Sequence, residues 1–195
     1  MSSLGKDLRK LLSDTQVLDE KEDLMAYAND ATFYLARRSP DAVAIPLSTE
    51  DVSKILKYAF EKRIPVVPRG AGSGLAGGCT PVHGGIVIDM KQMNSIVEIN
   101  RKNMTAEVEG GVVLDRFNRE LRTQKLFYPP DPQSMKVCTI GGNVATRAGG
   151  PRGVKYGTTE RYVTGLEVVL PDGSIITPGG KVVKQSCGYD LAHLF

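Results

Sequence analysis

The glycine-rich run Pro68–Gly78 constrains this chain more than any other stretch. It reads Pro-Arg-Gly-Ala-Gly-Ser-Gly-Leu-Ala-Gly-Gly and directly follows the apolar segment Ile64 to Val67. Glycines let several backbone N–H groups point at one position, which is how a chain binds a phosphate group without charged side chains. The run therefore predicts an anion-binding loop at the end of a strand.

Two common phosphate-binding loops do not fit this run. Residues 72–77 have the spacing of the dinucleotide fingerprint, but that motif opens a helix, whereas here turn residues lead into the strand-like Ile86-Val87-Ile88. A P-loop needs Gly-Lys followed by Ser or Thr, and Gly77-Gly78-Cys79 does not supply it. The interpretations left open are a free-standing nest of N–H groups between two strands and a flexible loop rich in glycine.

Composition is that of a globular protein with a core of its own. The 195 residues are 41% hydrophobic and 24% charged, with a net charge of +3 and no basic block, which argues against nucleic acid as a partner. No apolar run approaches the roughly 18 residues of a membrane span. The charges from Lys6 to Lys10 stand where a signal peptide needs an apolar core. We therefore expect a cytoplasmic protein without a transmembrane segment.

Cysteine and histidine usage predicts no metal site. Cys79, Cys138 and Cys187 lie far apart and form no Cys-x-x-Cys pair, so neither a disulfide framework nor a zinc site is indicated. His83 and His193 lack neighbours at ligand spacing, and we interpret both as structural.

The first half of the chain predicts a parallel α/β arrangement. Leucines 4, 8, 11 and 12 recur at helical spacing, and a second helical or turn segment is expected over Leu24 to Arg38. A strand over Ala42 to Pro46, a helix opened by the capping sequence from Ser48, and a strand over Ile64 to Pro68 imply a parallel pair. That order places the glycine run at the carboxyl end of a strand, where open α/β sheets bind ligands.

The second half predicts antiparallel structure. Short alternating segments over Ile86 to Met90, Ile96 to Asn100 and Met104 to Glu109 favour a meander. A helix is expected over Val113 to Lys125, and a hairpin around Pro171-Asp172-Gly173. Together, the two halves predict an α+β fold, with a small mixed sheet, an antiparallel sheet and flanking helices.

A second glycine cluster covers residues 141–157. Together with residues 70–85 it holds 13 of the 21 glycines, so close approach of the backbone is concentrated at two places. Two such loops suit one large ligand such as a dinucleotide, which needs a phosphate-binding loop and flat contacts for its rings. Two unrelated irregular loops are the alternative.

At this point the residues resemble a family. Five motifs, in order along the chain, look like the PCMH-type FAD-binding domain of the FAD-linked oxidases. They are the Pro68–Gly74 run, Pro130-Asp131-Pro132, Thr139–Asn143 with Ala148-Gly149-Gly150, Lys155-Tyr156-Gly157 and Gly188–Leu191. Within that group, the chain is similar to the FAD-linked component of glycolate oxidase, to bacterial D-lactate dehydrogenases and to D-2-hydroxyglutarate dehydrogenase. The resemblance implies a helical lead-in over residues 1–39 and a two-lobed FAD-binding domain over residues 40–195, with lobes of about 40–92 and 93–195 and FAD between them.

The resemblance also implies which residues contact FAD. Arg69 to Gly74 would offer N–H groups to the pyrophosphate, Gln133 to Thr139 and Thr146 to Gly149 would line the flavin and ribityl region, and Tyr156, Gly157 and Val163 would complete the pocket. The full implied set is Pro68, Arg69, Gly70, Ala71, Gly72, Ser73, Gly74, Pro130, Asp131, Gln133, Ser134, Thr139, Gly141, Gly142, Asn143, Thr146, Arg147, Ala148, Gly149, Tyr156, Gly157 and Val163.

Two departures from the family pattern matter. Ser73 stands where some relatives carry a histidine bonded to the flavin, so non-covalent FAD is expected. Arg147 stands where the hydroxy-acid oxidases usually have asparagine, which leaves two interpretations, a charge beside the flavin or substrate and a solvated surface charge.

The resemblance implies oxidation of a small D-2-hydroxy acid, of the glycolate or D-lactate type, with an electron-acceptor protein or iron–sulfur subunit as a further partner. Relatives continue past Gly-Tyr-Asp-Leu into a substrate cap that holds their metal-binding and catalytic histidines, so no catalytic residue is assigned and the chain is expected to be truncated before the cap. A non-catalytic FAD-binding module that requires a second chain is the alternative, with a UDP-acetylenolpyruvoylglucosamine reductase as a further one.

Overall fold

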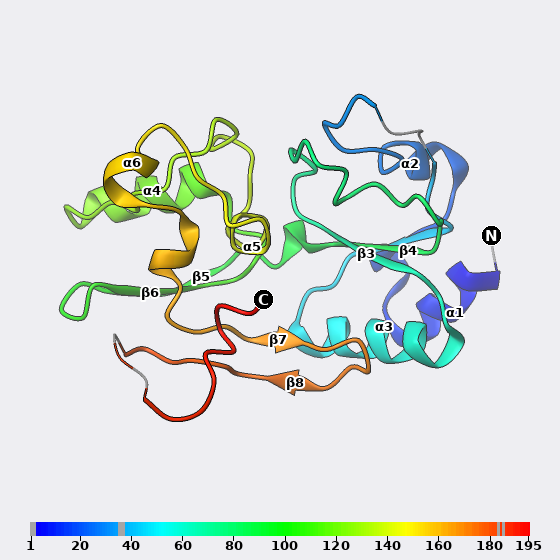
Figure 1. Ribbon diagram of the computed structural model, residues 1–195. Helices are drawn as coiled ribbons and strands as arrows, with labels where there is room; N and C mark the ends of the chain where they lie inside the picture. The colour runs from blue at the N-terminus through cyan, green and yellow to red at the C-terminus, as the bar shows by residue number, and fades with distance from the viewer. Residues whose placement is uncertain (1–2, 35–37, 183, 185) are drawn as a thin grey trace. The chain divides into compact units, whose positions relative to one another are not determined.

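The computed structural model describes residues 3–34, 38–182, 184 and 186–195. The chain divides into two compact units (Figure 1). The first unit comprises Met1–Met93 and Val169–Ile175, and the second comprises Asn94–Val168 and Ile176–Phe195. Each unit mixes helices and strands, which confirms the α+β prediction.

A four-stranded sheet forms the first unit, with strand order β1-β2-β4-β3. Strands β2 (Ala42–Ala44), β4 (Ile86–Asp89) and β3 (Val66–Arg69) are parallel, and β1 (Val17–Leu18) is an antiparallel edge. Every residue of β2 and β4 is buried, whereas β3 at the opposite edge is half-exposed. The glycine run therefore leaves the carboxyl end of an edge strand.

The position of β4 corrects the predicted topology. We expected β2 and β3 to pair directly and Ile86 to Met90 to join an antiparallel meander, but β4 lies between β2 and β3 and pairs with both in parallel. The physical reason is that Ile86, Val87 and Ile88 form a continuous apolar run that is buried on both faces. Such a run is typical of a central parallel strand, whereas a meander strand alternates.

Helices α1 (Ser3–Leu11) and α3 (Thr49–Lys62) supply much of the first core. Leu8, Ile55 and Ile86 are fully buried in one cluster, so the N-terminal residues that we expected as a lead-in are part of this unit. Helix α3 begins as predicted, because the Ser48 hydroxyl accepts the Asp51 backbone N–H over 3.2 Å.

The segment after α1 combines short helices with turns. It contains the short helices η1 (Asp14–Gln16) and α2 (Lys21–Met25), and residues 26–34 form turns. The predicted helical or turn segment of residues 24–38 is thus helix as far as Met25 and turns over residues 26–34, and its residues 35–37 lie outside the described part of the chain. A short helix η2 (Met90–Gln92) follows β4 and closes the first unit.

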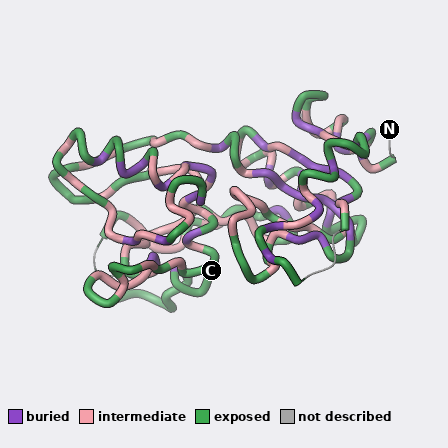
Figure 2. The backbone as a smooth tube through the Cα atoms, turned by 90° about the horizontal axis from the view of Figure 1, so that it is seen from above, coloured by how far each residue is buried: buried purple, intermediate pink, exposed green. Residues whose placement is uncertain are grey.

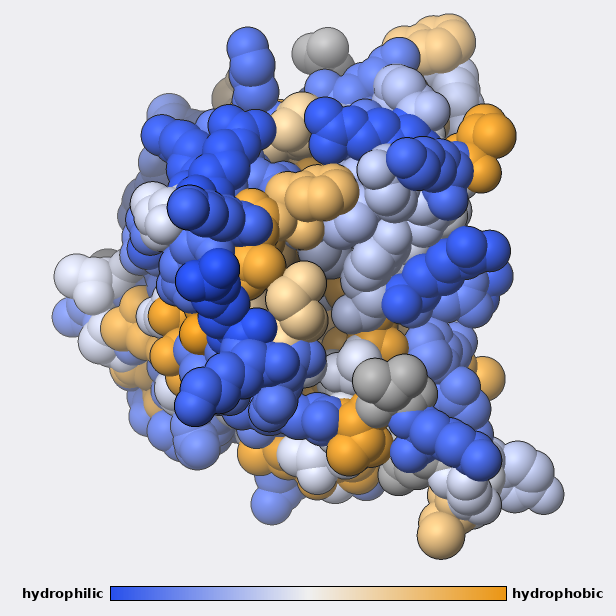
Figure 3. Space-filling view, turned by 90° about the vertical axis from the view of Figure 1, so that its left-hand side faces the viewer, coloured by the Kyte–Doolittle hydropathy of each residue, from blue (hydrophilic) through white to orange (hydrophobic). Residues whose placement is uncertain are grey.

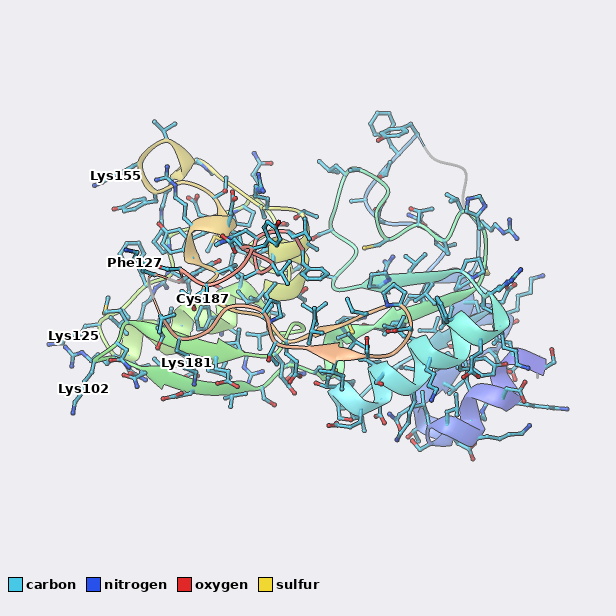
Figure 4. The ribbon with its side chains drawn as sticks, turned by 60° about the horizontal axis from the view of Figure 1, so that its bottom comes forward. Lys102, Lys125, Phe127, Lys155, Lys181 and Cys187 are labelled. Atoms are coloured by element: carbon cyan, nitrogen blue, oxygen red, sulfur yellow. The ribbon has the colours of Figure 1, made fainter. Side chains whose placement is uncertain are left out.

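The second unit is built on the hairpin of β5 (Ile96–Asn100) and β6 (Thr105–Val108). Helix α4 (Leu114–Thr123), predicted at this place, packs Phe117 and Leu121 into a core with hairpin residues. Lys181 binds Glu98 and Glu107 of the hairpin over 2.6 and 2.8 Å (Figure 4). Three short helices follow in the chain, α5 (Ile140–Ala145), α6 (Gly153–Tyr156) and η3 (Thr159–Tyr162).

The predicted hairpin at Gly173 is confirmed, with β7 (Val168–Val169) and β8 (Ile175–Ile176). Its tip belongs to the first unit, where the Gly173 carbonyl accepts the Ser53 hydroxyl over 2.5 Å. Buried stretches alternate with exposed loops in both units (Figure 2). Within the described ranges, no helix has the length and apolar character required to cross a membrane.

Candidate functional site

The first glycine segment, residues 68–78, leaves β3 after Arg69 and forms an open loop with several N–H groups that face no acceptor in the described part of the chain. Gly72 and Gly77 adopt the left-handed conformation, with φ of +65° and +77°. Among the residues that the structure describes, no acceptor contacts the backbone N–H groups of Ala71, Gly72, Ser73 or Gly74. Consecutive free N–H groups around a left-handed glycine have the geometry of an anion-binding nest. The bound anion itself stays a prediction.

The Arg69 side chain contacts Asn29 and Tyr27 at the base of this loop. Its Nη1 donates to the Asn29 carbonyl over 2.9 Å, and its guanidinium carbon lies 5.5 Å from the centre of the Tyr27 ring. A Cβ atom on Gly72 would collide with this guanidinium. Glycine is therefore favoured at 72 by the backbone conformation, and the free N–H groups rather than the Arg69 charge are left for a ligand.

Sequence reasoning missed the residues that brace this loop. Asp30 is buried, and its carboxylate accepts the N–H groups of Thr32 and Cys79 over 2.9 and 3.3 Å. The Thr32 hydroxyl accepts the Gly77 N–H over 2.8 Å, and the Ala31 N–H donates to the Gly72 carbonyl over 3.1 Å. The short polar side chains of residues 29–32, which favour Asx turns, were the available signal.

Charge and burial also shape the base of the loop. The Tyr27 hydroxyl donates to Asp89 over 2.8 Å, and burial, followed by this hydrogen bond, raises the Tyr27 pKa well above its usual value. Lys91 pairs with the same carboxylate over 3.0 Å. Tyr27 therefore stays protonated and donates to a compensated carboxylate at neutral pH.

The second glycine segment starts at the buried residue Thr139. The Thr139 side chain caps α5 by accepting the Gly142 N–H over 3.4 Å, and the Gly141 N–H donates to the Gly110 carbonyl over 2.8 Å. A Cβ atom on Gly141 would lie 2.9 Å from that carbonyl oxygen. The backbones at Gly110 and Gly141 can therefore approach only because residue 141 is glycine.

Asn143 carries an unsatisfied donor inside this segment. It is 3% exposed, and its carbonyl accepts the Ala148 N–H over 2.9 Å. Its side-chain Nδ2 is buried and has no hydrogen-bond partner within the described residues. A buried amide donor without an acceptor is costly, so this position fits a ligand that brings an oxygen or nitrogen acceptor, as FAD does.

Thr146 to Gly149 follow α5 and are fastened to η3. The Ala148 carbonyl accepts both the N–H and the hydroxyl of Thr159, over 3.0 and 2.8 Å. Arg147 has a φ of +51°, and its Nε lies 3.1 Å from Glu160 Oε2. The Arg147 charge, which sequence left open, is thus compensated by Glu160 although its side chain is 60% exposed.

The remaining predicted residues lie in the same unit. Asp131, which follows the buried Pro130, accepts the Arg152 N–H over 3.0 Å and pairs with its guanidinium. Ser134 closes a turn with its carbonyl, and Gln133 is exposed. Tyr156 meets Phe127 edge to face at 5.9 Å, under Lys155 (Figure 4).

Gly157 and Val163 flank η3. Gly157 has a φ of +80° and packs against the Arg161 side chain. Val163 lines a cavity of about 150 Å³ together with Arg147, Glu160 and His193. The structure thus brings residues 68–74 together in the first unit and residues 130–163 together in the second.

Nowhere in the described ranges do three histidine, cysteine or acidic side chains gather as metal ligands.

The surface around the second set is largely polar. Hydrophilic side chains dominate the face in Figure 3, with hydrophobic groups exposed between them. Phe127 on this unit is 52% exposed. Below the surface, burial raises the pKa of Tyr128 to about 12, so its hydroxyl remains protonated beside Thr159.

Comparison with known proteins supports FAD as the cofactor of this chain. The FAD binding domain family matches residues 40–179. The chain is 49% identical over 177 residues to the glycolate oxidase subunit GlcD of Bacillus subtilis, covering 91% of this chain and 37% of that protein. It is 39% identical to a D-lactate dehydrogenase of Anaerostipes hadrus, covering 95% of this chain and 39% of that protein.

Solved structures of similar proteins have the same fold. Alkyldihydroxyacetonephosphate synthase matches 97% of this chain and 36% of its own, with a TM-score of 0.83 and 25% identity. p-Cresol methylhydroxylase matches 97% of this chain and 37% of its own, with a TM-score of 0.77 and 27% identity. The chain spans less than half the length of these relatives. The chain therefore belongs to the family of FAD binding domains, and its cofactor is FAD.

Proposed function

We propose that this chain is the FAD-binding part of a flavin-dependent oxidoreductase that oxidises a D-2-hydroxy acid, of the glycolate or D-lactate type, to the 2-oxo acid. The 49% identity to a glycolate oxidase component over 91% of the chain carries this proposal. The similarity to D-lactate dehydrogenase supports the same substrate class.

The residues of this chain would bind and orient the cofactor. The free N–H groups of residues 71–74 would hold the pyrophosphate, because N–H dipoles fixed around a left-handed glycine stabilise negative charge without reorganising. The buried Nδ2 of Asn143 would donate to an acceptor on the ribityl or flavin part. When bound, FAD supplies the hydride acceptor for the substrate α-carbon.

FAD would be held without a covalent bond. Ser73 stands in the loop where a covalent attachment would need a more nucleophilic side chain, and its neighbours are glycines. Denaturation in acid should therefore release intact FAD into the supernatant.

Binding of FAD to the purified chain tests the cofactor site. In a fluorescence titration, Gly72→Ala should weaken FAD binding about tenfold, because alanine is strained at a φ of +65° and the nest loses its conformation. Gly78→Ala is the matched control, since a Cβ there meets no atom within 4 Å. Equal affinity of the two variants would contradict the assignment of the loop.

The substrate is tested separately. Reduction of an artificial dye by glycolate or D-lactate, with FAD bound, would support the hydroxy-acid oxidoreductase. Bound FAD without turnover would favour the second candidate, a module that needs another chain, such as an electron-acceptor protein or iron–sulfur subunit. The Bacillus relative is named as a subunit, which supports that candidate.

A further inference from the structure

His193 joins a segment near the end of the chain to the helix η3. Its Nδ1 lies 2.6 Å from Asp190 Oδ2, and its Nε2 lies 3.1 Å from the Glu160 carbonyl oxygen. The neighbouring Ala192 is buried, with 5% of its surface exposed. One imidazole thus spans 33 residues of sequence and holds residues 190–193 against η3.

Helix η3 also contacts the second glycine segment. Thr159, which is fully buried, donates twice to the Ala148 carbonyl, and the Glu160 carboxylate pairs with Arg147 over 3.1 Å. Glu160 therefore contacts both His193 and Arg147, and the adjacent Thr159 holds Ala148. All five residues lie in the second unit.

Both ring nitrogens of His193 face acceptors. The Asp190 carboxylate and the Glu160 carbonyl can only accept, so each nitrogen must carry a hydrogen to make its bond. A neutral imidazole carries one hydrogen and can satisfy one partner, whereas the imidazolium satisfies both. The two contacts are therefore complete only in the protonated ring.

We propose that His193 is a positioning residue for the FAD site, which clamps η3 in its protonated form and thereby holds Arg147 and Ala148 in place. The proposal rests on the FAD site described above. Asp190, Glu160 and Arg147 are the charged groups that face this clamp, and the two carboxylates outweigh the single guanidinium.

The direction of the pH dependence follows from this balance. The hydrogen bond to Asp190, more than any other contact, raises the pKa of His193 above its usual value of 6.5, while partial burial opposes the shift. A raised pKa in the folded state means that the clamp contributes fully below about pH 6.5 and is lost as pH rises through the raised value. FAD binding should weaken over the same interval.

Titrations of FAD binding between pH 5.5 and 8.5 test the clamp. The wild-type chain should lose roughly tenfold in affinity across this range, the effect of one hydrogen bond to a charged group. His193→Gln should bind FAD at every pH about as weakly as the wild type does at pH 8.5. His83→Gln, at the other histidine of the chain, should keep the wild-type profile.

A second measurement does not depend on FAD. NMR titration of the two histidine rings in the chain without cofactor should show His193 titrating above 6.5, and Asp190→Asn should lower that value. A His193 that titrates normally, or a His193→Gln variant with the wild-type pH profile, would overturn the clamp. If no variant binds FAD while the NMR shift is present, the FAD site fails and the clamp contacts stand.

Discussion

The Thr32 hydroxyl accepts a hydrogen bond from the backbone N–H of Gly77 over 2.8 Å, and so ties the turn after α2 to the far arm of the first glycine segment. Thr32 is 6% exposed, so water cannot replace it freely as a partner. The shape of the first glycine segment therefore depends on a residue 45 positions away in the sequence.

Thr32→Val should loosen this loop. Valine keeps the shape of the side chain but cannot accept the Gly77 N–H, which costs about 1 kcal/mol in the free energy of unfolding. FAD affinity should fall severalfold, as measured by titration of flavin fluorescence. Thr123→Val is the control, because Thr123 lies at the exposed end of α4. Unchanged FAD affinity in Thr32→Val would separate this hydrogen bond from cofactor binding.

Asp30 should make the first unit sensitive to acid. Burial alone would raise the pKa of this carboxyl, but hydrogen bonds from Thr32 and Cys79 outweigh burial and lower it. A lowered pKa in the folded state stabilises the protein above the unfolded value of about 4, and that stabilisation is lost as pH falls through the folded value.

Urea unfolding at two pH values measures this effect. Asp30→Asn should cost roughly 1 to 3 kcal/mol at pH 7, because its amide nitrogen cannot accept the Cys79 N–H, and the difference from wild type should shrink near pH 3. Asp23→Asn, at an exposed position of α2, should cost almost nothing at either pH. A difference that is constant with pH would argue against a charged Asp30 in the fold.

The three cysteines should react with thiol reagents at different rates. Cys187 is exposed (Figure 4), Cys138 is buried, and Cys79 is half-buried with a pKa that burial raises. Only the thiolate reacts, so Cys187 should be modified first and the other two slowly. The time course of thiol modification in the native chain checks this order, and Cys187→Ser should abolish the fast phase. A fast phase that survives in Cys187→Ser would show that Cys79 or Cys138 is accessible.

Gly173→Ala should destabilise the docking of the hairpin tip on α3. Gly173 has a φ of +86°, and a Cβ atom would lie 2.8 Å from both Lys57 Cβ and the Ser53 carbonyl oxygen. Left-handed strain and this collision together should cost about 2 kcal/mol in the free energy of unfolding. Gly180→Ala, where a Cβ meets nothing within 4 Å, is the control in the same thermal unfolding assay. A Gly173→Ala variant as stable as Gly180→Ala would mean that the tip does not dock.

Local patterns predicted much of the fold. The capping sequence at Ser48 and the helical spacing in α4 were correct because caps and amphipathic faces depend on residues within a few positions of one another. The turn at Gly173 was correct for the same reason. Residues 26–34 were predicted only as helix or turn, and the choice between the two depended on polar side chains that bond to the distant glycine loop.

In the candidate site, too, local features were predictable from the sequence and features that depend on distant residues were not. Both glycine segments were recognisable in the sequence, because glycine adopts the φ of +65° at Gly72 without strain and allows the close approach of Gly141 to Gly110. The unsatisfied amide of Asn143 and the pairing of Arg147 with Glu160 were not, since both depend on what the fold places around these side chains.

By itself, the sequence determined where the anion-binding loop lies and which family the chain resembles, because backbone freedom and ordered motifs are properties of neighbouring residues. Only the tertiary structure decided that β4 separates β2 from β3, that Asp30 and Thr32 brace the loop, and that His193 faces two acceptors. Each of these depends on segments brought together by burial of distant apolar residues, and no local spacing records which segments will meet.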